Sequence, residues 1–220
     1  MKNAIITILA IMTICGNTNA HTHNISSGGA LVHWPSNQVI TITIDPTINM
    51  IRTDAADITE DVFMRWLDYV DADIVVDFVH AQCDASTLNC VSYDHSAIDG
   101  TYEGIGVNYN RNWWADTGEI TNSSVKIYPR MKVENFESTM LHEAGHFWGM
   151  EHSDNPAAVM YPYNNSDRTE LHQDDINGIM TIYGDGAVYP TIKPDKVDYS
   201  FQGCSINAGA SKKTIWSLIF

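Results

Sequence analysis

The chain has 220 residues, of which 44% are hydrophobic and 18% charged, with 12 lysines and arginines against 27 aspartates and glutamates. This length supports one sizeable domain with its own core, and ten tyrosines, six tryptophans and six phenylalanines exclude an intrinsically disordered chain. A net charge of −15 leaves too few cations to neutralise a phosphate backbone, so no nucleic-acid partner is expected.

The first 20 residues have the pattern of a secretory signal. Lys2 is followed by the apolar run Ala4–Cys15, and the small, polar segment Gly16–Ala20 predicts cleavage after Ala20. The run is shorter than the roughly 20 residues that a membrane span needs, so no span is expected. Acylation of the cysteine that ends it is disfavoured by the bulky isoleucine before it. We therefore expect residues 1–20 to act as a signal peptide that directs export of the protein to the medium, the periplasm or the cell surface.

Periodicity predicts the elements of one domain over residues 21–185. Alternating apolar residues predict four strands, at Val39–Ile44, Ile74–Val79, Gly104–Asn110 and Ile120–Tyr128. Helical spacing predicts three helices, at Asp54–Val70 with Thr53 as N-cap, at Val133–Trp148, and at Gln173–Tyr183. Residues 80–103 are expected to form a loop, and 186–220 an irregular tail. The order of elements predicts an α+β fold with a twisted mixed sheet, and we expect a monomer.

Export also determines how the cysteines are interpreted. Cys83, Cys90 and Cys204 would remain in an oxidising compartment after cleavage. Cys83 and Cys90 flank a short polar loop, which predicts a local disulfide and leaves Cys204 over. None of the three has the close paired spacing of a zinc ribbon, so a metal site built on sulfur is not expected.

Residues 142–152 spell HEAGHFWGMEH, which fits the pattern H-E-x-x-H-x-x-G-x-x-H. His142 and His146 are four residues apart, so they lie one turn apart on one side of a helix and can bind a single ion. The other side of this helix carries an apolar stripe that we expect to face the core: Val133, Phe136, Met140, Ala144 and Phe147.

The third histidine needs a break in that helix. If the helix continued, His152 would stand about 15 Å along the axis from His142. Gly149 can end the helix in a left-handed conformation and return His152 towards the same ion. Three neutral nitrogens leave a fourth position open for water, which is typical of catalytic zinc. Glu143, next to a ligand, is then placed to take a proton from that water and return it to a leaving amine.

The motif, followed by Met160 in the segment AAVMYP, resembles the metzincin clan of zinc proteases with its Met-turn. Within the clan, Val159–Tyr163 and Leu171–Gly184 resemble the matrixin family, which includes the matrix metalloproteases. The resemblance implies an active-site cleft between an upper part, with the sheet and two helices, and a lower part after Gly149. Met160 would form an apolar floor under the imidazoles.

The resemblance also implies a function, a secreted zinc endopeptidase. A protein or peptide substrate would lie extended along an edge strand, expected at Ser124–Tyr128, and Pro162 and Tyr163 would begin the wall of its side-chain pocket. Calcium is a candidate structural ion in the Asp94–Gly118 region. The alternatives are an inactive zinc-containing module that binds proteins, disfavoured because Glu143 is retained, and a structural zinc domain, disfavoured by the open fourth position.

Two further expectations concern the remaining histidines and the tail. Five histidines are expected to be ordinary surface or capping residues: His21, His23, His33, His80 and His172. The tail, with Cys204, Lys212-Lys213 and an apolar end, loosely resembles the C-terminal sorting signals of some bacterial exported proteins. The whole pattern therefore resembles a secreted, bacterial-type matrixin with a candidate sorting segment.

Overall fold

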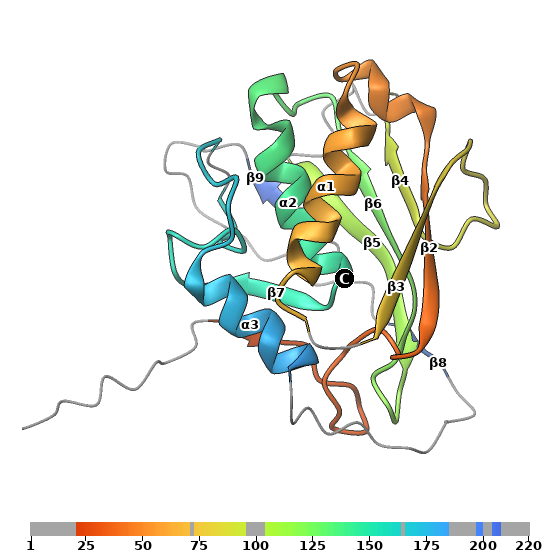
Figure 1. Cartoon of the computed structure of the whole chain (residues 1–220), viewed down its shortest axis with the longest axis vertical. Coiled ribbons are helices and arrows are strands. Elements are labelled where there is room, and N and C mark those ends of the chain that lie inside the picture. Colours follow the sequence, from red (N-terminus) through yellow and green to blue (C-terminus); the bar gives the residue numbers. More distant parts are fainter. Residues whose placement is uncertain are drawn as a thin grey trace, which may run out of the picture.

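The computed structural model describes residues 21–70, 73–95, 104–163, 166–184, 197–199 and 204–207. The predicted signal segment 1–20 and most of the tail 186–220 lie outside these residues, so the signal peptide and the sorting segment stay predictions. The elements in chain order are shown in Figure 1. Within the described part of the chain, no helix is both long enough and apolar enough to span a bilayer.

A mixed sheet forms one layer of the domain. Its five main strands follow the order β3 (Ile74–His80), β2 (Gln38–Ile44), β4 (Cys90–Tyr93), β6 (Ile120–Ile127) and β5 (Gly104–Trp114). The first four are mutually parallel, and β5 is antiparallel to β6. Two short strands, β8 (Val197–Tyr199) and β9 (Cys204–Asn207), pair antiparallel with β5.

Helices α1 (Ala55–Leu67) and α2 (Phe136–Phe147) pack together against this sheet (Figure 1). Short 3₁₀ helices, η1 (Pro46–Met50) and η3 (Val133–Asn135), precede them. A second part of the domain follows α2 and contains α3 (Gln173–Tyr183) and β7 (Met150–Ser153), which pairs antiparallel with β1 (His21–His23). The α+β fold with a mixed sheet and three helices is thus confirmed.

Aromatic and aliphatic side chains of the core between the sheet and the helices hold α2 in place. Alternate β2 residues Ile40, Ile42 and Ile44 are at most 3% exposed and turn towards the helices. The indole nitrogens join the two helices, since Trp66 donates to Leu141 O at 2.9 Å and Trp148 donates to Phe63 O at 3.1 Å. Aromatic packing and buried hydrogen bonds together fix the helix that carries the sequence motif.

The structure corrects several expectations. The segment 80–103, expected as a loop, contains β4, a strand too short for its alternation to be visible. The N-cap of α1 is Asp54 rather than Thr53. The predicted core residue Val133 is 50% exposed, because it lies in η3 before the helix begins.

Strand β6 is also not the edge strand that Ser124–Tyr128 was expected to be, because β4 and β5 pair with it on its two sides. The tail expected to be irregular contains the two strands β8 and β9.

Candidate metal centre

The three motif histidines come together at the junction of the two parts of the domain. His142 and His146 project from α2, and His152 comes from β7. Their ring centroids lie 4.8 to 5.3 Å apart, and one nitrogen from each ring lies within 4.8 Å of the other two. Three imidazole nitrogens this close can converge on one ion with bonds of about 2 Å.

Gly149 makes this convergence sterically feasible. Its φ is +99°, a left-handed conformation that side chains other than glycine rarely adopt. A Cβ at this position would also lie 2.6 Å from the carbonyl oxygen of Val32. The amide of Gly149 donates to His146 O at 3.0 Å as the helix ends, and β7 begins at the next residue. The predicted break in the helix therefore lies at this glycine.

Backbone carbonyls orient the two helical imidazoles. His142 Nδ1 lies 2.7 Å from Val159 O, and His146 Nδ1 lies 2.8 Å from Met150 O. A carbonyl can only accept, so Nδ1 carries the proton in each ring and the Nε2 lone pair is left for a ligand. Both Nε2 atoms are buried and have no hydrogen-bond partner among the described residues. A metal ion would satisfy them.

The electrostatics of the centre favour neutral rings. Burial, followed by the neighbouring imidazoles, lowers the pKa of His142 and of His146 well below the usual value, and Arg111 adds to the effect at His146. Burial also lowers the pKa of His152, against an opposing effect of Glu151. Neutral imidazole is the form that binds a metal, so the residues fit a zinc ion at neutral pH.

Glu143 lies on the same helix and is fully buried between α2 and β5. A Cβ built on Gly106 of β5 would lie 3.0 Å from Glu143 Oε1 and 3.0 Å from Thr139 Cγ2. The backbone of β5 therefore passes directly beside this carboxylate. A bulkier residue at position 106 would push against it.

A carboxylate beneath the site holds the segment that contains Met160. Asp175 is fully buried and accepts hydrogen bonds from the amides of Val159 at 2.8 Å and Met160 at 3.0 Å. The carbonyl of Val159 in turn orients His142. Met160 itself is buried against α2, because a Cβ on Gly145 would lie 2.4 Å from its Sδ. The motif helix and the Met160 segment thus fit together closely.

The sequence did not reveal the role of Arg111. This β5 residue is 7% exposed and donates to His146 O at 2.7 Å, while its other terminal nitrogen pairs with Glu151. It therefore ties β5 to the end of α2 and to β7. Arginine in a strand of an acidic chain is a weak signal, and only the fold shows that it reaches the metal centre.

Two histidines were wrongly expected at the surface. His21 is 7% exposed, and its Nε2 lies 3.0 Å from Asp174 Oδ2, which also accepts from Ser153 Oγ at 2.6 Å. His33 is 2% exposed. His21 is buried because β1 pairs with β7 and contacts α3, whereas the backbone of His33 pairs with Gly118 and Ile120 at the turn between β5 and β6. His172 does cap a helix, as expected, in a capping box with Asp175 at the start of α3.

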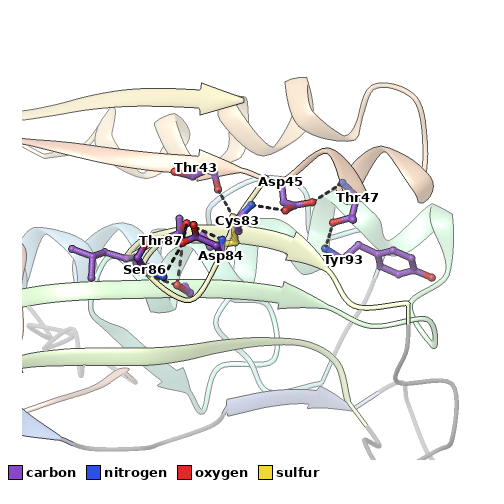
Figure 2. The surroundings of a disulfide bond; sticks show 11 residues. Thr43, Asp45, Thr47, Cys83, Asp84, Ser86, Thr87 and Tyr93 are labelled. Carbon is purple, nitrogen blue, oxygen red and sulfur yellow. Dashed lines mark hydrogen bonds between the residues drawn. A yellow bond between two sulfur atoms is a disulfide. The ribbon is translucent and has the colours of Figure 1, made fainter. Parts of the chain in front are cut away.

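The expected cysteine pair is bonded, and Figure 2 shows its surroundings. Asp45 accepts hydrogen bonds there from the amides of Cys83 at 2.7 Å and Thr47 at 2.9 Å. Burial alone would raise the pKa of the Asp45 carboxyl, but these hydrogen bonds outweigh it and the pKa lies below the usual value. The disulfide and this carboxylate together fix the end of β2.

Comparisons with known proteins agree with this geometry. The sequence profile of the family described as Matrixin matches residues 33–184. The chain belongs to the matrixin family. Human matrilysin is 53% identical over 53 residues, 23% of this chain and 20% of that protein. Metalloendoproteinase 5-MMP of Arabidopsis thaliana is 39% identical over 77 residues, 34% of this chain and 21% of that protein. This matrixin chain therefore spans about a fifth of the length of these relatives.

Among solved structures, that of myroilysin covers 69% of this chain and 95% of its own, with 15% identity and a TM-score of 0.42.

Proposed function

We propose that this matrixin domain is a zinc-dependent endopeptidase in which His142, His146 and His152 hold the metal. The observation that carries the proposal is the convergence of three imidazoles beside a buried carboxylate. Bound zinc supplies Lewis acidity towards a carbonyl and lowers the pKa of water to about 7. Glu143 accepts the proton of the attacking water and returns it to the leaving amine.

The substrate would be a protein or peptide that binds in extended form. The expected edge strand at Ser124–Tyr128 is internal, so β5, whose backbone passes Glu143, takes over this role in the proposal. Pro162 and Tyr163 would begin the pocket wall; Tyr163 is 42% exposed, and its carbonyl accepts a hydrogen bond from Arg168 at 2.6 Å. A calcium ion near Asp94 has less support, because Lys126 lies 3.3 Å from that carboxylate.

We also propose export of the protein, by removal of residues 1–20 as a signal peptide. The disulfide of Cys83 with Cys90 supports this, because such bonds persist in oxidising compartments. N-terminal sequencing of the exported protein should find His21 first, and a mature chain that starts at Met1 or Cys15 would contradict it.

The catalytic proposal is tested by Glu143→Gln with zinc content measured on the same samples. We expect the cleavage of denatured casein to fall by at least about 100-fold, the lower end of general acid–base effects, with one zinc ion still bound. Glu134→Gln is the matched control, because Glu134 is exposed just before the same helix. Equal cleavage by both variants would exclude the mechanism, and zinc binding without cleavage by any form of the protein, including forms with the tail displaced, would favour the binding module.

A further inference from the structure

The outer edge of β5 is the edge of the main sheet nearest the metal centre. Strand β5 follows β6 at one end of the five-strand order, and it contacts α2. An edge strand presents a row of backbone N–H and C=O groups that pair readily with another extended segment. In β5 this row passes Glu143, since Gly106 lies against that carboxylate.

The chain's own tail pairs with this edge. Strand β8 pairs antiparallel with β5 through Asn112↔Tyr199 and its neighbours, and β9 pairs antiparallel through Asn108↔Cys204 and Val107↔Ser205. The two short strands thus pair with both ends of β5, β8 at residues 112–114 and β9 at residues 104–108. Figure 1 shows β9 and β8 near opposite ends of β5.

The register of β9 places it over the part of β5 that matters for catalysis. Gly106 lies between Gly104 and Val107, whose partners are Asn207 and Ser205. A peptide that reached Glu143 by adding to the sheet would need the backbone groups of the same segment. Two strands cannot pair with one edge at the same place, so the tail and an extended substrate exclude each other.

We infer that the tail strands β8 and β9 fill the substrate edge of β5 and inhibit the peptidase until the tail is displaced or removed. The inference rests on the proposed function of this site. Only 12 residues separate the end of the main domain at Gly184 from Val197. Such a short tether keeps the tail at an effective concentration of about 1 mM near the edge of β5, so a dilute substrate competes poorly with the tail.

The lone cysteine of the tail provides a direct test. Directly opposite residues of antiparallel strands have Cα atoms about 4.5–5.5 Å apart, within the range of about 4.4–6.8 Å that a disulfide spans. Asn108→Cys in the full-length chain should therefore form a disulfide with Cys204, detected by mass spectrometry. Asn112→Cys is the control, because its partner is Tyr199 and it should not cross-link.

The cross-link should change activity. We expect the oxidised, zinc-loaded Asn108→Cys protein to cleave labelled denatured casein at least tenfold more slowly than its reduced form. Unmodified protein taken through the same oxidation and reduction corrects for effects on the native disulfide. Conversely, the double variant Ser205→Pro with Ile206→Pro removes two consecutive backbone N–H donors. Successive N–H groups of a strand point to opposite sides, so one of the two faces β5. We expect this variant to cleave casein about tenfold faster. The same change at Lys212 and Lys213, beyond the paired segment, should not raise cleavage.

The outcomes separate this inference from the proposed function. Absence of the Asn108→Cys disulfide would show that β9 does not pair as described, and a disulfide without any change in cleavage would overturn the inhibition. If no form cleaves casein although zinc is bound, the proposed endopeptidase is wrong. In that case, binding of labelled casein fragments is measured by fluorescence anisotropy instead. Weaker binding by the cross-linked form than by the reduced form supports the inference, and equal binding overturns it.

Discussion

Gly145 offers a sharp test of how the metal helix fits its surroundings. It is the fourth residue of the HEAGH segment, and a Cβ built on it would lie 2.4 Å from Met160 Sδ and 2.6 Å from Trp66 Cζ2. Both neighbours are fully buried, so neither can move away into solvent. In Gly145→Ala, the methyl group must therefore displace the Met160 segment or the packing of α1 against α2.

The sign of the effect follows from two opposing magnitudes. Alanine in a helix interior is favoured over glycine by about 1 kcal/mol. Overpacking a filled core costs about 1–3 kcal/mol, and overlap with two buried side chains places this case at the upper end. We expect a net loss of about 1–2 kcal/mol in the free energy of unfolding. Because Val159, next to Met160, orients His142, we also expect zinc affinity to fall about 10- to 100-fold.

Urea unfolding of the zinc-free protein measures the first quantity, and competition with a chelator measures the second. The matched control is the same change in a Met160→Ala background, where the nearer clash is absent and Gly145→Ala should cost less. A Gly145→Ala protein that gains about 1 kcal/mol and binds zinc as tightly as the parent would refute the reasoning, because it would show that helix propensity outweighs the clash.

The remaining predictions concern stability. Asp175→Ala leaves the buried amides of Val159 and Met160 without an acceptor. Each unsatisfied amide costs about 1–3 kcal/mol, so urea unfolding should show that the free energy of unfolding falls by about 3 kcal/mol or more. Replacing both cysteines of the short-loop disulfide by serine should cost about 2–3 kcal/mol in the same assay and leave zinc content unchanged. Asp45, whose pKa is lowered on folding, stabilises the protein above the unfolded carboxyl pKa of about 3.9, and this contribution is lost as the pH falls through the folded value. Asp45→Asn should therefore lose about 1–3 kcal/mol at pH 7 and show a weaker acid dependence.

Each of these has a result that contradicts it. An Asp175→Ala protein of unchanged stability would mean that other acceptors replace the carboxylate. Loss of zinc in the serine variant would show that the disulfide supports the metal centre rather than the end of β2. A parallel pH profile for Asp45→Asn and the parent would exclude Asp45 as a source of acid sensitivity.

Features that depend on local spacing could be predicted from the sequence. The helical period placed His142 and His146 on one side of α2, and the observed bounds of α3 are those predicted. The need for a left-handed residue identified Gly149 as the point where His152 turns back. In each case the physical cause acts over a few neighbouring residues, so the pattern of those residues contains the answer.

Contacts between distant segments could be found only in the folded domain. Strand β4 is only four residues long. It is a strand because it pairs with β2 through Thr43↔Cys90 and with β6 through Val91↔Val125. That pairing also makes β6 internal and leaves β5 to pass Glu143. The supports of the metal centre, Arg111 and Asp175, act across 35 and 15 residues respectively. Backbone pairing between remote segments leaves little trace in periodicity, because any extended segment offers the same N–H and C=O groups.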